Sequence, residues 1–342
     1  MNNLISYPLK DQLPEPGKTI EVAPGVFWLR MPLPFKLDHI NLWVIDEGDG
    51  WTIVDTGINL PEVRERWQML LDGQLAGKPV KRLIVTHFHP DHVGLAGWFE
   101  ETLGLQLWMT LGEWGMARNL KLETKERSSG YLNKFYHATG FDEDLLSIIP
   151  ERSESYPSRI TVPPAGMRRI QDGEVIKMGQ HDWKVMIGTG HSPEHACLYC
   201  ESLNVMISGD QILPRISPNI SIWPQEPTAD PLSQFLDSLI KFKDLPDDLL
   251  VLPSHDYPFH GLHARLDDLA HHHDERLEET WNLCETPVTA YQVLKGLFTR
   301  KLDSHQVFFA IGESLAHLHH LEAKGRLKRT QQDNGVYLFS QL

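Results

Sequence analysis

The chain has 342 residues, 41% of them hydrophobic, so it can bury the core of one large domain and a smaller one. Its formal net charge of −14 disfavours a broad surface for nucleic acid or for anionic membranes. Its three cysteines cannot all pair, which argues against a disulfide framework and fits a reducing compartment better.

The N-terminal residues show no basic segment followed by an apolar core, so no signal peptide is predicted. No stretch approaches the roughly 20 apolar residues that a membrane helix needs. We therefore expect a cytoplasmic protein with no membrane partner.

The first predicted elements are strands. Residues 26–29, 39–45 and 51–54 are apolar runs, and an acidic turn at residues 46–50 joins the last two as in a hairpin. This order predicts an antiparallel start, and the chain has no Gly-x-Gly-x-x-Gly or phosphate loop of a nucleotide-binding fold. Residues 61–71 predict an amphipathic helix packed on the sheet. Its apolar stripe consists of Val63, Trp67 and Leu70.

Three histidines and an aspartate lie between a predicted buried strand, residues 83–85, and a helix that starts near Val93. The four residues are His87, His89, Asp91 and His92. Extended backbone sends alternate side chains to one face, so His87 and His89 can bind the same ion. Asp91 and His92 are neighbours at the helix start and point in different directions, so they suit a second ion.

Three later segments add ligands of the same kind. His191 lies on a glycine-rich turn, Asp210 follows the apolar run 205–207, and His255 follows the run 249–252. We expect each to lie at a strand end on one edge of a sheet. Imidazole and carboxylate together suit zinc, iron or manganese, whereas calcium or magnesium prefers oxygen ligands only.

The ordered set His-x-His-x-Asp-His, then His, Asp and His, resembles the metallo-β-lactamase superfamily over about the first three quarters of the chain. The resemblance implies an α+β fold, a four-layer αβ/βα sandwich, for residues 1–262. It implies one ion on His87, His89 and His191, a second on Asp91, His92 and His255, and Asp210 bridging the two. Asp91 and Asp210 are then the expected catalytic residues.

The resemblance implies two divalent metal ions, with zinc as first choice and iron or manganese as alternatives. A hydroxide shared by the ions would attack a small-molecule substrate, for which we favour a thioester, ester or lactone. The His-x-His-x-Asp-His form resembles the hydroxyacylglutathione hydrolase branch. The C-terminal region differs from that branch's glutathione-binding helices, which argues against glutathione thioesters.

Three other functions remain open at this point. The same metals could serve a nuclease or phosphodiesterase, although the acidic net charge argues against it. A non-catalytic ligand-binding protein could keep the ligand set without turnover. A di-iron redox protein would need a separate partner, because no flavin-binding domain is visible in the chain.

Several residues near the expected site have two interpretations. Asp55 could orient a metal ligand or only shape its turn. Residues 112–165 form a long insertion that could be a lid or substrate wall. Its Tyr131, Tyr136 and His137 could reach a substrate, but we favour packing in a small core of the insertion itself. The proline-rich loop after Asp210, which holds Trp223, is expected to border the pocket.

The remaining residues, 263–342, predict a helical linker and a small domain that resembles a winged helix. The predicted elements are a helix at 266–283, a helix at 290–298, one or two helices within 307–325, and a two-stranded wing. We expect the histidines 271–273 to lie on a solvated face, and His317, His319 and His320 to lie on the surface. Residues 284–342 carry a net charge of only +2, which favours packing or homodimer contacts over duplex binding.

Cys197 and Cys200 form a Cys-x-x-Cys within a run that predicts a strand. The odd spacing puts the two thiols on opposite faces of that strand. We therefore expect packing residues and not a redox or zinc pair.

Overall fold

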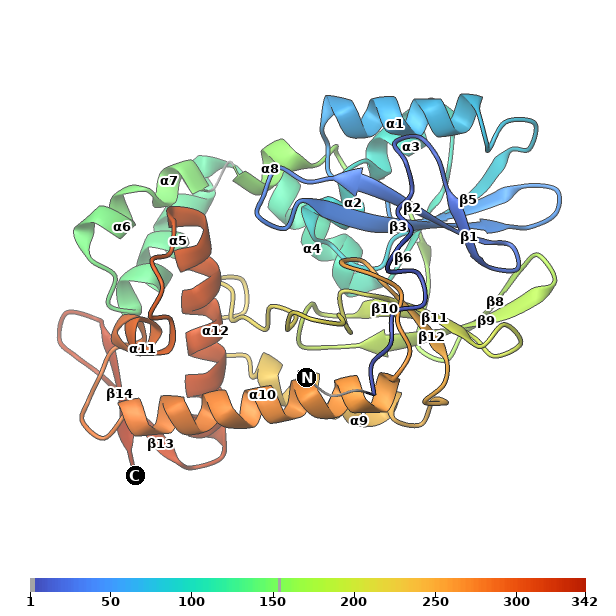
Figure 1. Ribbon diagram of the computed structural model, residues 1–342. Helices are drawn as coiled ribbons and strands as arrows, with labels where there is room; N and C mark the ends of the chain where they lie inside the picture. Colours follow the sequence, from blue (N-terminus) through green and yellow to red (C-terminus); the bar gives the residue numbers. More distant parts are fainter. Residues whose placement is uncertain (1–3, 153–154) are drawn as a thin grey trace.

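The computed structural model describes residues 4–152 and 155–342 and places two β-sheets face to face, with helices on their outer faces (Figure 1). The first sheet has seven strands in the order β1 to β7. They are β1 (Ile20–Ala23), β2 (Val26–Pro32), β3 (His39–Asp46), β4 (Trp51–Val54), β5 (Val80–Ile84), β6 (Leu107–Met109) and β7 (Arg168–Arg169). Strands β1 to β4 pair antiparallel, as predicted, and β4 to β7 pair parallel.

The second sheet has five strands in the order β12-β11-β10-β9-β8. They are β8 (Val175–Met178), β9 (His181–Gly188), β10 (His195–Cys200), β11 (Val205–Gly209) and β12 (Leu250–Pro253). The pair β11–β12 is parallel, and helix α9 (Pro231–Phe242) lies between these strands in the chain as the crossover that a parallel pair requires.

The sheets bury a core of large aromatic side chains between them, including Trp28, Trp43 and Trp183. Helices α1 (Pro61–Asp72) and α3 (Ala96–Leu103) cover the first sheet, and α1 buries the predicted stripe. Helices α9 and α10 (Leu262–Leu283) cover the second (Figure 1). The predicted four-layer αβ/βα architecture is confirmed.

The insertion consists of short helices. They are α4 (Leu111–Leu122), α5 (Lys125–Ala138), α6 (Glu143–Ser147), α7 (Ile149–Arg152) and α8 (Ser155–Arg159). The prediction that its aromatic residues form a separate core is wrong. Tyr136 and Phe141 pack against Phe308 of the C-terminal region, with ring centroids 4.8 and 5.4 Å away. The insertion and the C-terminal region therefore share one core.

The C-terminal region contains α11 (Ala290–Leu297), α12 (Ser304–Ala323) and the antiparallel strands β13 (Leu327–Gln331) and β14 (Tyr337–Gln341). Capping boxes begin both helices, at Thr289 and at Asp303, because each side chain accepts the backbone N–H three residues later. The segment 307–325, predicted as one or two helices, is thus covered by one continuous helix and its C-terminal turn.

The histidines of the C-terminal region are mostly buried, contrary to prediction. His271 is exposed, but His273 on the same helix is 1% exposed and packs against Phe235. His317, His319 and His320 are also buried. The physical reason is that α12 is enclosed by α9, α10, α11 and β13, so little of its surface faces solvent.

The three cysteines are free and buried. Cys197 packs into the core beneath α9, while Cys200 packs between the two sheets. Their predicted placement on opposite faces of β10 is confirmed.

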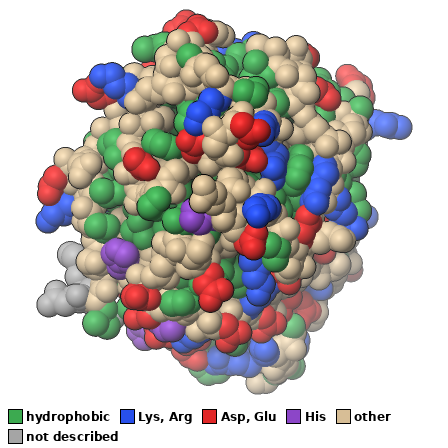
Figure 2. All heavy atoms as spheres, turned by 90° about the vertical axis from the view of Figure 1, so that its right-hand side faces the viewer, with side chains coloured by type: hydrophobic (Ala, Val, Ile, Leu, Met, Phe, Trp, Pro, Cys, Tyr) green, Lys and Arg blue, Asp and Glu red, His purple; other side chains and the backbone are tan. Residues whose placement is uncertain are grey.

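One face of the molecule carries charges of both signs in close mixture (Figure 2). At one end of strands β3 to β5, basic residues pair with acidic residues at the end of β3 and in the turn that follows it. These pairs are Lys78–Asp46, Lys81–Asp49 and Arg82–Glu47. Within the described ranges, no helix is both long and apolar enough to cross a bilayer.

Candidate metal centre

The structure brings all seven predicted ligand residues together where strands of the two sheets end. The residues follow the ends of β5, β9, β11 and β12. They form two groups that could each hold a metal ion. The first group is His87, His89, His191 and Asp210, and the second is Asp91, His92 and His255.

The first group is formed by three imidazoles around one carboxylate oxygen. His87 Nε2 lies 2.9 Å from His89 Nδ1 and 3.3 Å from His191 Nε2. The Oδ2 atom of Asp210 lies 3.6 Å from His191 Nε2 and 4.0 Å from His87 Nε2. Nitrogen atoms this close would repel one another if protonated, so this arrangement favours neutral rings with lone pairs turned to a common point.

The second group uses the other oxygen of the same carboxylate. Asp210 Oδ1 lies 3.5 Å from His92 Nε2 and 3.4 Å from His255 Nε2. Asp91 Oδ2 lies 3.8 and 3.6 Å from the same two nitrogen atoms. Asp210 therefore stands between the groups, with one oxygen directed at each.

Asp55 orients the second group and also shapes a turn, so both of its interpretations hold. Its carboxylate accepts the backbone N–H of Thr86 at 2.7 Å and the Nδ1–H of His92 at 2.8 Å. It has a positive φ of 64°, which Asp tolerates better than most residues. The hydrogen bond at Nδ1 leaves the Nε2 lone pair of His92 facing the site.

Backbone and hydroxyl oxygens orient three more imidazoles in the same way. His191 Nδ1 donates to the carbonyl of Asn219 at 2.9 Å, and His255 Nδ1 donates to that of His39 at 2.8 Å. His87 Nδ1 lies 3.0 Å from Thr86 Oγ1, whose own proton goes to Asp55. In each case Nε2 is left to face the site.

The electrostatics of the two groups differ. Burial, followed by the neighbouring histidines, holds the pKa of His87 and His89 well below the usual range. At His92 burial acts in the same direction, but Asp55, Asp210 and Asp91 outweigh it and raise its pKa well above the usual range. The carboxylates around the second group therefore stabilise a positive charge there, and that charge can be a proton on His92 or a metal cation.

Two buried atoms that face each other at the site are consistent with a bound cation. Among the described residues, eight buried side-chain nitrogen and oxygen atoms have no hydrogen-bond partner, and His92 Nε2 and Asp210 Oδ1 are two of them. An orphaned buried polar atom costs on the order of 1–3 kcal/mol, so a native structure rarely keeps one without reason. These two atoms are ligand atoms of the two groups, and a divalent ion bound there would satisfy both.

Glu113 is a functional residue that the sequence analysis missed. It is fully buried on α4 and accepts hydrogen bonds from Phe88 N, Ser192 Oγ and Glu194 N, at 2.9, 2.6 and 2.7 Å. Burial raises its pKa to about 7. Glu113 thus ties the loop of the first three histidines to the loop of His191, and no local sequence signal distinguishes it from other glutamates of the insertion.

His195 was also missed, and it explains the glycine before Asp210. Its Nε2 accepts the backbone N–H of Asp210 at 3.1 Å, which fixes the bridging residue. Gly209 has a φ of +55°, and a Cβ there would lie 2.4 Å from His195 Cε1. Only glycine fits this approach without strain.

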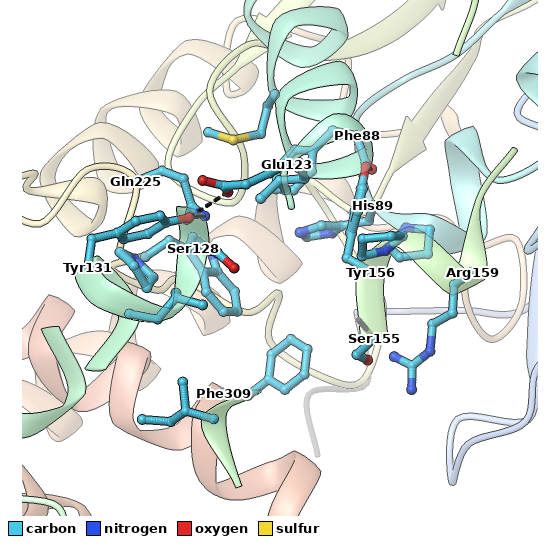
Figure 3. Close-up of a pocket in the computed structure, with 18 of the residues that line it drawn as sticks. Phe88, His89, Glu123, Ser128, Tyr131, Ser155, Tyr156, Arg159, Gln225 and Phe309 are labelled. Carbon is cyan, nitrogen blue, oxygen red and sulfur yellow. Dashed lines mark hydrogen bonds between the residues drawn. The ribbon is translucent and has the colours of Figure 1, made fainter. Parts of the chain in front are cut away.

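A cavity of about 200 Å³ opens beside His89 (Figure 3). Tyr131 and Tyr136 line it, so the preference for packing alone was wrong for these two. Trp223 also lines it, which confirms that the loop after Asp210 borders the pocket.

Comparison with known proteins identifies the family. A model described as the metallo-beta-lactamase superfamily matches residues 36–255, and one described as the metallo-beta-lactamase-like C-terminal domain matches residues 277–342. The chain belongs to the metallo-beta-lactamase superfamily. The winged-helix resemblance and the hydroxyacylglutathione hydrolase branch stay predictions.

Individual relatives of this superfamily hydrolase support the same family assignment. The crystal structure of a beta-lactamase domain protein from Burkholderia ambifaria is 43% identical, with a TM-score of 0.91 and full coverage of both chains. A probable metallo-hydrolase, YqjP, from Bacillus subtilis is 26% identical over 91% of this chain and 97% of its own. The acyl-coenzyme A thioesterase MBLAC2 from Gallus gallus is 24% identical over 55% of this chain and 63% of its own.

Proposed function

We propose that the chain is a dinuclear metal-dependent hydrolase of small thioesters, esters or lactones. The observation that carries the proposal is the position of Asp210, whose two oxygens face two separate ligand groups. A carboxylate with this geometry is suited to bridge two cations a few ångströms apart.

Each residue has a role in this proposal. His87, His89 and His191 hold one ion, and Asp91, His92 and His255 hold the other. When bound, divalent ions such as zinc, iron or manganese polarise the substrate carbonyl and lower the pKa of a water between them.

The chain itself supplies orientation and a proton acceptor. Asp55, Asn219 and His39 hold the imidazoles through their Nδ1 atoms, so that the ligand geometry is set before substrate arrives. Asp91 directs Oδ2 at His92 and His255. Its other oxygen is the atom that we assign to take the proton of the attacking water.

A thioester is the substrate that two independent observations favour. The cavity beside His89 is lined largely by apolar side chains, which suits an acyl group better than a phosphodiester. Two relatives carry thioesterase names, MBLAC2 and the atrochrysone carboxyl ACP thioesterase from Aspergillus fumigatus. The excess of Asp and Glu over Lys and Arg argues against a polyanionic substrate.

Metal analysis combined with a substrate panel tests the proposal. The purified chain should contain close to two transition-metal ions, lose activity with a chelator and regain it with zinc, iron or manganese. The panel should include acyl thioesters, esters, lactones and labelled RNA, with His271→Gln as a control for a histidine outside the site. Cleavage of RNA alone, or full activity without bound metal, would contradict it.

A further inference from the structure

The cavity beside His89 is built by segments that lie far apart in the chain. They are the first ligand loop, the insertion, the loop after Asp210 and helix α12. Its apolar lining consists of Phe88, Met116, Leu132, Ile149, Trp223 and Phe309 among others. Figure 3 shows Phe309 across the open space from Phe88 and His89.

We propose that this cavity binds the acyl chain of a thioester substrate and that Phe309, from the C-terminal region, limits the length of that chain. The proposal rests on the proposed function, and it gives the C-terminal region a part in substrate selection. His89 belongs both to the first ligand group and to the cavity wall. A carbonyl held at the ligand groups therefore directs one of its two substituents into the cavity.

Several polar groups of the cavity wall already have partners within the protein. Tyr131 donates to Glu123 at 2.6 Å (Figure 3) and accepts from Gln225 at 3.3 Å. Tyr156 donates to the carbonyl of Phe88 at 2.5 Å. A ligand with polar groups would have to break these hydrogen bonds, whereas a hydrocarbon chain leaves them intact. The paired tyrosines and the apolar lining therefore favour an apolar occupant.

Phe309 is held in place by the way in which α12 docks on the loop after Asp210. Its ring packs edge-on against Trp223, with centroids 5.6 Å apart. The backbone N–H of Ile222 donates to the carbonyl of Gly312 at 3.1 Å, and a Cβ on Gly312 would lie 2.7 Å from Ser221 Cβ. This close contact leaves little freedom for Phe309 to withdraw, so it acts as a fixed wall.

The size of the cavity predicts a limit on chain length. Its volume of about 200 Å³ is below the range of about 300–1,000 Å³ of pockets for drug-sized ligands. Each methylene that enters should raise kcat/KM about fourfold, and the gain should stop when the chain reaches the far wall.

The test uses the metal-loaded full chain and a series of N-acetylcysteamine thioesters from acetyl to dodecanoyl, which share one leaving group. Phe309→Ala should raise the dodecanoyl-to-butyryl ratio of kcat/KM roughly 15-fold, the effect of about two more buried methylenes. Phe309→Trp should lower the ratio about fourfold. The matched control is Phe298→Ala, which removes an aromatic ring of the same region that packs near Arg276 and leaves the cavity lining unchanged.

The proposal is overturned if the acetyl thioester is cleaved but kcat/KM does not depend on chain length. It is also overturned if both Phe309 variants keep the wild-type ratio, or if Phe298→Ala changes it equally.

A second measurement separates failure of this inference from failure of the proposed function. Calorimetry with ketone analogues, in which a methylene replaces the thioester sulfur, reports chain binding without turnover. Affinity that grows with chain length and shifts in the Phe309 variants supports the acyl cavity even if no thioester is hydrolysed. Affinity that is independent of chain length, in a protein that does hydrolyse thioesters, overturns the cavity and leaves the hydrolase proposal in place.

Discussion

Two regions of the molecule bury several histidines, but only one of them is suited to hold metal. At the ligand groups, three carboxylates lie within 4 Å of imidazole nitrogens, namely those of Asp55, Asp91 and Asp210. Around α12, buried histidines contact mainly backbone carbonyls and one another, and a single carboxylate oxygen, Asp230 Oδ1, lies 3.3 Å from His320 Nδ1. The difference teaches that several carboxylates converging on the same imidazole nitrogens, more than buried histidines, mark a place for a cation.

The α12 region shows what burial does to imidazoles on which no group of carboxylates converges. His273 Nδ1 lies 3.3 Å from His317 Nε2, and His317 Nδ1 donates to the carbonyl of Glu313 at 2.8 Å. Burial lowers the pKa of His273 to about 3 and that of His317 to about 4. In the part of the chain that the structure describes, no three ligand atoms meet there. These rings are neutral packing residues at pH 7.

The largest expected effect comes from removing the bridging carboxylate. Asp210→Asn should lower kcat/KM by at least about 100-fold and reduce the bound metal, because the neutral amide no longer offers a charged oxygen to each ligand group. His317→Gln, in the comparison region, should keep wild-type metal content and activity. Metal analysis and steady-state kinetics on both variants check this prediction. Equal losses of bound metal and of kcat/KM in the two variants would contradict the distinction between the two regions.

A smaller effect is expected from the carboxylate that orients His92. Asp55→Asn keeps the shape of the side chain but replaces one accepting oxygen with a donor facing His92 Nδ1 or Thr86. We expect metal affinity to fall about 10- to 100-fold, as measured by competition with a chelator. Asp49→Asn, at an exposed turn, is the control. An unchanged affinity in Asp55→Asn would leave that residue only its part in the turn.

The smallest expected effect is on the pH dependence of stability, and it tests whether the α12 histidines are neutral in the folded protein. A histidine with a depressed pKa in the folded state takes up its proton more readily when unfolded, so it destabilises the fold as pH falls below about 6.5. Removing it in His317→Gln should reduce the slope of unfolding free energy against pH by about 1.4 kcal/mol per unit between pH 4 and 6.5.

A second residue also contributes to the slope of unfolding free energy against pH, and another variant serves as the control. Burial raises the pKa of Glu313, which lies near Arg276, to about 7. The contribution of Glu313 to the free energy of unfolding therefore falls as pH rises above about 4.5, which opposes the contribution of the histidine. His271→Gln, at an exposed position of α10, should leave the slope unchanged. Urea unfolding across this pH range measures all three proteins, and parallel slopes would show that His317 titrates normally.

The layers and the candidate ligand residues could be predicted from the sequence because an ordered motif resembles a known family and because of a local pattern. Each candidate ligand follows a short apolar strand, and neighbouring strands bring such ends together. The stripe of Val63, Trp67 and Leu70 placed α1 on the sheet by the same kind of local periodicity.

What the sequence did not provide depends on contacts between distant segments. The burial of His273 and His317 follows from how α9, α10 and α12 enclose one another, which helical periodicity alone does not determine. Phe309 lines the cavity only because α12 docks on the loop after Asp210. The role of Glu113 follows from two loops that lie more than 70 residues apart in the chain.

Anomalous X-ray scattering from crystals of the metal-loaded protein tests the central claim most directly. We predict two peaks about 3.5–4 Å apart, one on each side of Asp210, and none beside His273 and His317. A single peak that Asp210 does not contact, or a metal ion bound at the α12 histidines instead, would contradict the account.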